Sequence, residues 1–245
     1  MTTFWNDFPG MPEALAGVSD RIREASYSDN SIISEALDSL FGGDGKLLRP
    51  GLLLLAGQFG KPQKRKHCAL AAALEMLHVA TLVHDDVIDD SPLRRGLPAA
   101  HVRYGRKDAV LVGDYLLARS FLLAAEYTST RNAVLLSRAV SVICAMELEQ
   151  DADRCKADVS VRRYLRKILG KTALLFSLAC QVGASEAKAA PAVVGRLRRI
   201  GYSAGMAFQI IDDILDYAGD PGLVRKPTGN DLRSEIGRAS CRERV

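Results

Sequence analysis

The sequence is poor in the features that mark disulfide-rich, zinc-binding and nucleic-acid-binding proteins. It has five cysteines among 245 residues, and none forms a CxxC pair. An odd number of scattered cysteines is typical of reduced thiols in a cytoplasmic protein, so we expect neither a disulfide framework nor a zinc site. The formal net charge is only +4 and no dense Lys/Arg block occurs, so nothing indicates nucleic-acid binding.

Membrane, nucleotide and strand signals are also scarce. The longest apolar stretches, such as PGLLLLAG, are too short to cross a bilayer, and the N-terminus MTTFWNDFPG does not resemble a signal peptide. We therefore expect no membrane anchor. No GxxxxGK[ST] or GxGxxG loop is present. Alternating Val/Ile/Thr runs bounded by tight turns are nearly absent, which argues against a β-sheet protein.

The chain is instead rich in helical periodicity. With 48% hydrophobic residues it can form one sizeable core. Several runs, such as LAAALEML and YLLARSFLLAAE, are apolar nearly all round, which is typical of helices buried inside a bundle. We predict an all-α, multi-helix bundle in one domain over residues 1–234. The expected helical segments are 12–26, 31–41, 50–60, 64–89, 107–127, 131–156, 159–183 and 191–218.

The last eleven residues, EIGRASCRERV, do not continue this pattern. Their back-translation contains a common short-read sequencing adapter. We therefore expect residues 235–245 to be read-through that is excluded from fold reasoning, with the native sequence ending near Ser234 and the C-terminal part absent.

Two acidic clusters share one spacing. Each has aspartates at positions i, i+1 and i+4 near the end of an apolar helix: Asp85, Asp86 and Asp89 in the first, Asp212, Asp213 and Asp216 in the second. Such like charges repel on one helix face, and the C-terminal end of a helix disfavours anions. A hard divalent cation offsets both effects. Carboxylates without a histidine or cysteine set favour Mg²⁺ over zinc, and Mg²⁺ in such sites usually holds phosphate.

Basic residues that suit phosphate stand at predicted helix boundaries beside glycine or proline. They are Lys46, Arg49, Arg94, Arg95, Lys171 and Lys226. Arginine forks match pairs of phosphate oxygens. His78 lies seven residues before Asp85, hence near the same helix face, and we expect it to contact substrate.

Together these motifs resemble those of the trans-isoprenyl diphosphate synthases, or polyprenyl synthetases. The segments that carry the resemblance are HDDVIDD with the following RRG, FQIIDDILDYAGD, GKLLRP, GKTA and KPTGNDL. It implies an all-α prenyltransferase fold, usually as a homodimer. It also implies Mg²⁺-dependent, head-to-tail addition of isopentenyl diphosphate to an allylic diphosphate, with release of pyrophosphate.

The resemblance also assigns roles to residues. The six aspartates would hold Mg²⁺ that bridges the allylic diphosphate. The basic residues that would meet that diphosphate are Arg94, Lys171 and Lys226. The residues that would bind isopentenyl diphosphate are Lys46, Arg49, His78 and Arg95. Thr172 and Gln209 match positions that line the reacting centre.

The sequence departs from the family pattern in three places. Asp44 precedes Gly45, Leu47 replaces an arginine, and Arg225 stands where glycine is common. A terpene cyclase is disfavoured because the second cluster is a full aspartate motif, and a non-catalytic subunit is disfavoured because no aspartate is lost. Two alternatives stay open, namely a short-chain farnesyl or geranylgeranyl diphosphate synthase and a catalytic subunit that needs a separate partner.

Product length is expected to depend on residues before the first cluster. Ala80 and Thr81 lie about one turn before Asp85 and are small, which in this family leaves room for a growing chain. Met76 and Leu77 lie deeper and would set the floor. We therefore favour a medium or long polyprenyl product.

Overall fold

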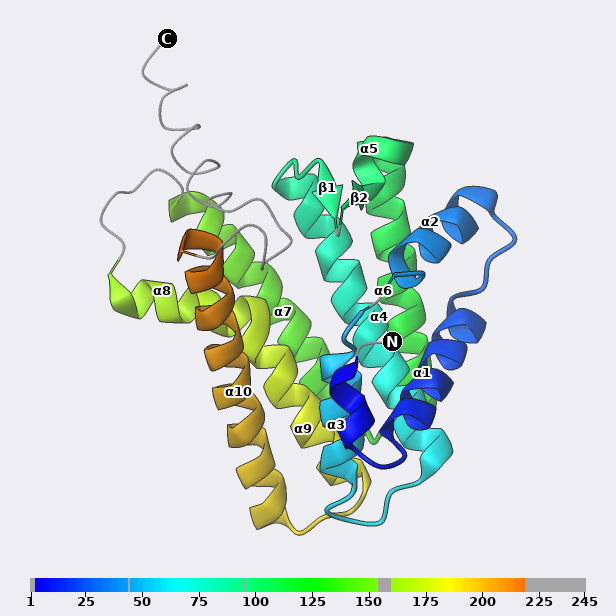
Figure 1. The fold of residues 1–245 in the computed structure, drawn as a ribbon, viewed down its shortest axis with the longest axis vertical. Helices are drawn as coiled ribbons and strands as arrows, with labels where there is room; N and C mark the ends of the chain where they lie inside the picture. Colours follow the sequence, from blue (N-terminus) through cyan, green and yellow to red (C-terminus); the bar gives the residue numbers. More distant parts are fainter. Residues whose placement is uncertain (1–2, 44, 95, 154–159, 219–245) are drawn as a thin grey trace. The chain divides into compact units, whose positions relative to one another are not determined.

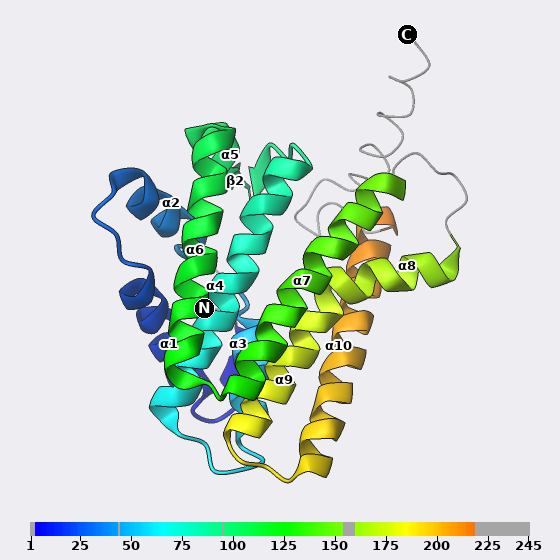
Figure 2. The same ribbon diagram turned by 180° about the vertical axis from the view of Figure 1, so that it is seen from behind.

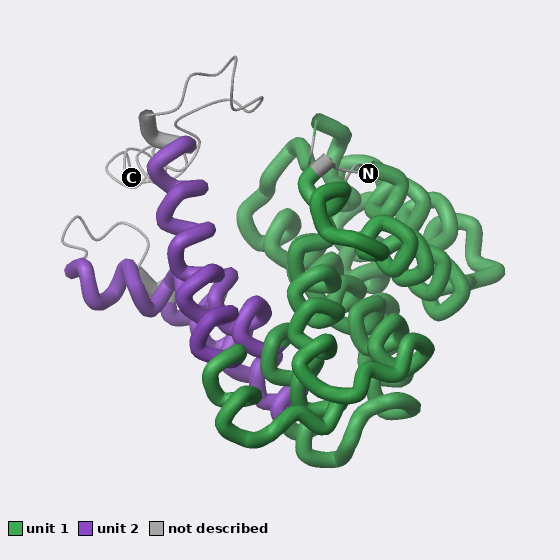
Figure 3. Tube along the Cα trace, turned by 60° about the horizontal axis from the view of Figure 1, so that its bottom comes forward, with its two compact units in different colours: residues 1–134, 179–197 green, residues 135–178, 198–245 purple. Residues whose placement is uncertain are grey.

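The structure is a computed structural model that describes residues 3–43, 45–94, 96–153 and 160–218, apart from the side chains of residues 150–153, 171 and 216–218. Arg95, Lys226 and the predicted read-through at 235–245 lie outside the described residues. The chain divides into two compact units, residues 1–134 with 179–197 and residues 135–178 with 198–245, which Figure 3 draws in different colours.

The described residues form ten α-helices, which confirms the all-α prediction (Figure 1). The first half of the chain contains the 3-10 helix η1 (Thr3–Asp7), α1 (Met11–Ser26), α2 (Ser31–Phe41), α3 (Leu48–Gly57), α4 (Lys64–Ile88), β1 (Leu93–Arg94), β2 (Leu97–Pro98), α5 (Ala100–Tyr104) and α6 (Arg106–Tyr127). The second half contains α7 (Thr130–Asp153), α8 (Val161–Ile168), the π-helical turn η2 (Leu169–Ala173), α9 (Leu174–Glu186) and α10 (Pro191–Ala218).

Helix α4 is the core of the first unit. It packs against α1, α3, α5 and α6, and its middle is buried on nearly every side. By length and composition alone α4 could cross a membrane, contrary to our expectation that the apolar runs are too short, but 72% of the apolar window lies inside the protein. A buried core helix passes the same test, so α4 is weak evidence for a membrane span.

A polar cluster centred on Glu186 joins the ends of four helices in the first unit. Its Oε1 accepts hydrogen bonds from Thr128 Oγ1, from the backbone N and Oγ of Ser129 and from Asn132 Nδ2, at 2.6–2.8 Å. Its Oε2 lies 2.5 Å from Lys66 Nζ. Burial would raise the pKa of Glu186, but the donors from Lys66, Ser129 and Asn132 outweigh burial and hold the pKa at about 2. The cluster therefore ties the start of α4 and the α6–α7 junction to the end of α9.

The segment 159–183 is helical as predicted, but it is not one regular α-helix. The helical structure runs from residue 161 to 186, but it is divided into α8, the π-turn η2 and α9, and the change of direction between α8 and α9 is visible in both Figure 1 and Figure 2. A π-turn inserts an extra residue and rotates what precedes it, and such turns often occur at functional sites. Gly170 in this turn packs closely against Met146, and a Cβ at that position would force the Met146 side chain to shift.

Three cysteines in the described residues, Cys68, Cys144 and Cys180, are free thiols. Cys180 is buried, and burial raises the pKa of its thiol to about 11. Cys144 is exposed.

Candidate active site

The first aspartate cluster lies at the C-terminal end of α4, in the first unit. The helix continues through Asp89, whose N–H donates to the Asp85 carbonyl at 2.8 Å. Asp90 then adopts a left-handed conformation (φ 52) and Ser91 N–H donates to the Asp86 carbonyl at 3.0 Å. This is a Schellman ending with aspartate in the position where glycine is usual. Asp85 and Asp89 therefore share one helix face, as predicted.

Asp86 is held by an arginine of the hairpin that follows. It is only 4% exposed, and Arg94 on β1 donates from Nε to Oδ2 at 2.9 Å and from Nη2 to Oδ1 at 2.5 Å. β1 and β2 pair antiparallel, with Arg94 opposite Leu97, and this short hairpin was not predicted. The structure therefore places together two residues that we expected at the diphosphate, and the contact of Arg94 with that diphosphate stays a prediction.

Asp90 has a different set of partners. Its Oδ1 lies 2.7 Å from Arg106 Nη2 and 3.6 Å from His101 Nε2. His101 belongs to α5 and is buried, and Arg106 opens α6. These contacts anchor the segment that follows the cluster. They give Asp90 partners on α5 and α6, although it lies beside the three aspartates that are predicted to hold Mg²⁺.

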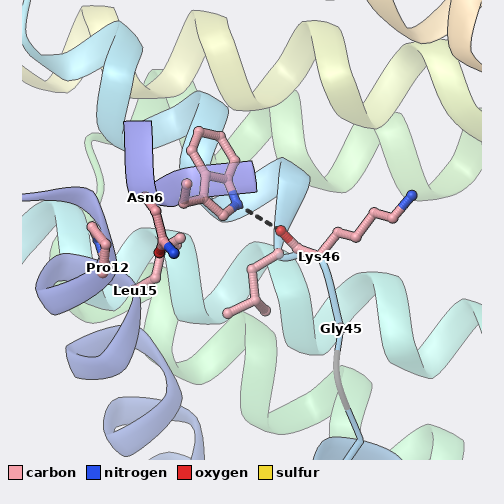
Figure 4. Close-up of a pocket in the computed structure, with 7 residues that line it drawn as sticks. Asn6, Pro12, Leu15, Gly45 and Lys46 are labelled. Carbon is pink, nitrogen blue, oxygen red and sulfur yellow. Dashed lines mark hydrogen bonds between the residues drawn. The ribbon is translucent and has the colours of Figure 1, made fainter. Parts of the chain in front are cut away.

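The segment GKLLRP is anchored by Trp5, which the sequence reasoning missed. Trp5 Nε1 donates to the Lys46 carbonyl at 2.7 Å, while the Lys46 side chain extends away from the small pocket beside it (Figure 4). The next residue, Leu47, has a left-handed backbone (φ 44) and precedes α3. The only available signal was the aromatic cluster in the N-terminal sequence FWNDF.

Arg49 lies in the first turn of α3, and its Nε is buried. Burial lowers the pKa of Arg49 to about 10, and the charge of Glu75 opposes that shift. Arg49 therefore stays protonated at neutral pH and can bind an anion.

The remaining α4 residues of the prediction lie on different faces. His78 and Thr81 are partly exposed and share the face of Asp85, and Thr81 Oγ1 donates to the His78 carbonyl at 2.8 Å. Ala80, five residues before Asp85, lies about 140° round the helix from that face. Ala80 is 1% exposed, and Met76 and Leu77 are both fully buried. Thr81 is thus better placed than Ala80 to meet a chain that begins at Asp85.

The second aspartate cluster lies near the end of α10, in the second unit, where a chain of hydrogen bonds leads to Asp213. Thr172 Oγ1 donates to Gln209 Oε1 at 2.5 Å, and Gln209 Nε2 donates to Asp213 Oδ1 at 2.8 Å. Tyr164 Oη donates to Asp213 Oδ2 at 2.8 Å. Thr172 and Gln209 are both buried. Their predicted place beside the reacting centre stays a prediction.

Tyr164 was not predicted as a functional residue. Burial raises the pKa of Tyr164 to about 12, and its hydrogen bond to Asp213 and the charge of that carboxylate add to the shift. The hydroxyl therefore stays a donor at neutral pH. The Lys171 and Asp216 side chains lie outside the described residues, so their predicted roles stay predictions.

The aspartates present the oxygen donors that Mg²⁺ prefers. Among the described residues, no three His, Cys, Asp or Glu side chains gather closely enough to form a metal cage. Mg²⁺ usually takes one or two carboxylates and completes its shell with water and phosphate oxygens. The pair Asp85 and Asp89 on one face of α4 fits that requirement, as does the oriented carboxylate of Asp213.

A model of the polyprenyl synthetase family matches residues 30–237. The chain belongs to this family. It is 41% identical over 222 residues to heptaprenyl diphosphate synthase component 2 of Geobacillus stearothermophilus, covering 91% of this chain and 69% of that protein. This polyprenyl synthetase spans 62% to 69% of the length of the heptaprenyl and octaprenyl diphosphate synthases that it matches.

Solved structures agree with that assignment. A geranylgeranyl pyrophosphate synthase from Lactobacillus brevis matches with a TM-score of 0.89 and 39% identity, covering 96% of this chain and 73% of that chain. A polyprenyl synthase from Caulobacter crescentus, in complex with calcium and isoprenyl diphosphate, matches with a TM-score of 0.86 and 40% identity, covering 91% and 68%. The fold is therefore that of the prenyl diphosphate synthases, and a divalent cation is bound in one relative.

Proposed function

We propose that this polyprenyl synthetase catalyses the Mg²⁺-dependent, head-to-tail condensation of isopentenyl diphosphate with an allylic diphosphate. The products would be a polyprenyl diphosphate and pyrophosphate. The observation that carries the proposal is that α4 and α10 each end on the i, i+1, i+4 aspartate spacing, in a chain of the polyprenyl synthetase family.

In this reaction the allylic C–O bond breaks and leaves pyrophosphate. The double bond of isopentenyl diphosphate attacks the allylic carbon, and a proton is then lost to restore a double bond, we propose to the departing pyrophosphate. Charge grows on the leaving diphosphate in the transition state, so pre-placed cationic groups accelerate the step. No protein nucleophile is required.

The aspartates would hold Mg²⁺, which supplies charge neutralisation at the diphosphate when bound. We assign this role to Asp85, Asp86, Asp89, Asp212, Asp213 and Asp216. Arg49, which is cationic at neutral pH, would bind a diphosphate together with Lys46. The buried apolar side chains of α4 would keep water from the allylic cation.

We further propose a medium or long product. Thr81 is small, partly exposed and on the face of Asp85, so it leaves space for a growing chain. Thr81→Phe is expected to shorten the product, because the ring would fill that space, whereas the similarly shaped Thr81→Val would not. Product length is read by thin-layer chromatography after removal of the diphosphate, and equal lengths for Thr81→Phe and the parent would contradict this assignment.

A subunit that needs a partner is favoured by one observation, the name "component 2" of the Geobacillus relative. The first experiment therefore incubates the chain alone with Mg²⁺, isopentenyl diphosphate and farnesyl diphosphate, with EDTA as control. Condensation that EDTA abolishes supports the proposal. Activity only after a second component is added supports the heteromeric alternative. No condensation by folded protein with any allylic starter, with or without that component, rejects both.

A further inference from the structure

Tyr164 donates a hydrogen bond to the second aspartate cluster. The proposed reaction gives this tyrosine no role. Tyr164 comes from α8, and its hydroxyl lies 2.8 Å from Asp213 Oδ2. The other oxygen of the same carboxylate accepts the Gln209 amide at 2.8 Å. Each oxygen thus accepts a hydrogen bond from a neutral donor, and the two donors come from different helices. These two hydrogen bonds fix the orientation of the carboxylate.

The amide of Gln209 can donate to Asp213 only in one orientation. Because the ionised carboxylate of Asp213 can only accept, the NH₂ group of Gln209 points toward it, and Thr172 Oγ1 donates to Gln209 Oε1 at 2.5 Å. Thr172 itself lies in the π-turn η2, while Tyr164 lies in the helix before that turn. The geometry of the π-turn therefore decides where both arms of the hydrogen-bond network reach Asp213.

This arrangement leaves Asp213 able to bind a cation. An ionised carboxylate has about four lone-pair sites, and the two hydrogen bonds occupy two of them. Neutral donors add no positive charge that would compete with a metal ion. Groups that orient a metal ligand in this way typically change metal affinity or activity when they are removed.

We propose that Tyr164 is a positioning residue that orients Asp213 for a divalent cation, and that it thereby sets the Mg²⁺ requirement of the enzyme without contributing to the binding of isopentenyl diphosphate. The proposal rests on the proposed function in assigning Asp213 to the metal. It gives Tyr164 a part that neither the aspartate spacing nor the basic motifs predicted.

The test compares Tyr164→Phe, which removes only the hydroxyl, with Tyr202→Phe as a matched control. Tyr202 lies on the same helix as Asp213 and is 39% exposed. Binding of Mn²⁺ in the presence of inorganic pyrophosphate is followed by electron paramagnetic resonance, which does not need turnover. We expect Tyr164→Phe to weaken Mn²⁺ binding about 10-fold or more, and Tyr202→Phe to change it less than about twofold.

Kinetics provide the second readout. We expect the Mg²⁺ concentration for half-maximal activity to rise by a similar factor in Tyr164→Phe, while the KM for isopentenyl diphosphate stays within about twofold of the parent value. Circular dichroism verifies that each variant is folded. A general structural role would instead raise the KM for isopentenyl diphosphate and also lower the midpoint of unfolding.

The outcomes separate this proposal from the proposed function. Equal Mn²⁺ binding by Tyr164→Phe and the parent, or no Mn²⁺ binding by the parent with pyrophosphate, overturns the role of Tyr164. Tyr164-dependent Mn²⁺ binding by a parent that performs no condensation supports the positioning role and rejects the proposed reaction. Parallel changes in the KM for isopentenyl diphosphate and in stability also overturn the proposal.

Discussion

At the scale of single residues, two aspartates at the end of α4 form ion pairs with arginines. Asp86 is nearly buried, and it is compensated by the two-pronged hydrogen bond from Arg94. Asp90, four residues later, meets Arg106 at the surface, where both side chains are more than 60% exposed. A buried carboxylate that loses its partner carries a desolvation cost, whereas an exposed pair is screened by water.

We therefore expect Arg94→Ala to lower the free energy of unfolding by about 1–3 kcal/mol, because it leaves a buried carboxylate without its partner. The matched control Arg106→Ala should cost less than about 1 kcal/mol. Urea denaturation at neutral pH measures both. Equal losses in the free energy of unfolding of the two variants would show that the buried Asp86–Arg94 pair stabilises the fold no more than the exposed pair does. Arg94→Lys should recover only part of the loss because lysine cannot form the fork.

At the scale of helices, one buried carboxylate links several helix ends of the first unit. The Glu186 network joins α4, the α6–α7 junction and α9. The folded-state pKa of Glu186 is about 2, below its ordinary 4.5, so its contribution to stability is present above pH 4.5 and is lost as the pH falls toward 2.

Glu186→Gln is expected to lower the free energy of unfolding at pH 7 by about 1–3 kcal/mol, because the Lys66 charge loses its partner. It should also flatten the loss of stability between pH 4.5 and 2, since glutamine does not titrate. Urea midpoints measured across that range check both effects. Glu24→Gln, at an exposed pair with Arg21, is the matched control and should change stability by less than about 1 kcal/mol. An unchanged pH slope in Glu186→Gln would contradict the assignment.

In the second unit, the packing of the π-turn η2 can be tested by substituting its glycine. Gly170→Ala should destabilise the fold and reduce condensation activity, because the added Cβ must displace Met146 beneath the turn that carries Lys171 and Thr172. Gly195→Ala in α10 meets no atom within 4 Å, so it should stabilise the helix by about 0.5–1 kcal/mol. Thermal unfolding and initial rates are measured for both. A Gly170→Ala variant as stable and as active as Gly195→Ala would refute the packing argument.

At the scale of the whole molecule, the two aspartate clusters belong to different compact units, α4 in the first and the end of α10 in the second. A ligand that binds the folded chain stabilises it by mass action, whatever the arrangement of its parts. Stability in the presence of Mg²⁺ and pyrophosphate therefore tests the metal–phosphate assignment without requiring turnover.

With Mg²⁺ and pyrophosphate together at about 100 times the dissociation constant, we expect stabilisation of about 2.7 kcal/mol. For a protein of this size, that raises the Tm by about 5–10 °C. Mg²⁺ alone, or pyrophosphate with EDTA, should give a much smaller rise. Differential scanning calorimetry measures the shift, and an equal Tm with and without the pair would count against the site.

Much of the local structure could be predicted from the sequence. The apolar spacing predicted α4 over 64–89 and α10 over 191–218. The missed features are the π-turn, the β1–β2 hairpin and the role of Trp5. Gly170 of the π-turn packs against Met146, a contact between distant residues, and the hairpin is too short to show a strand pattern.

The sequence by itself determined the all-α class, the two aspartate clusters and the family. These depend on helical spacing and on short motifs, which are local properties of the chain. Only the tertiary structure decided that Arg94 holds Asp86, that Trp5 anchors Lys46 and that Tyr164 reaches Asp213. Trp5 and Lys46 are 41 residues apart and Tyr164 and Asp213 are 49 apart, so packing between distant elements brings them together, and no local pattern specifies such contacts.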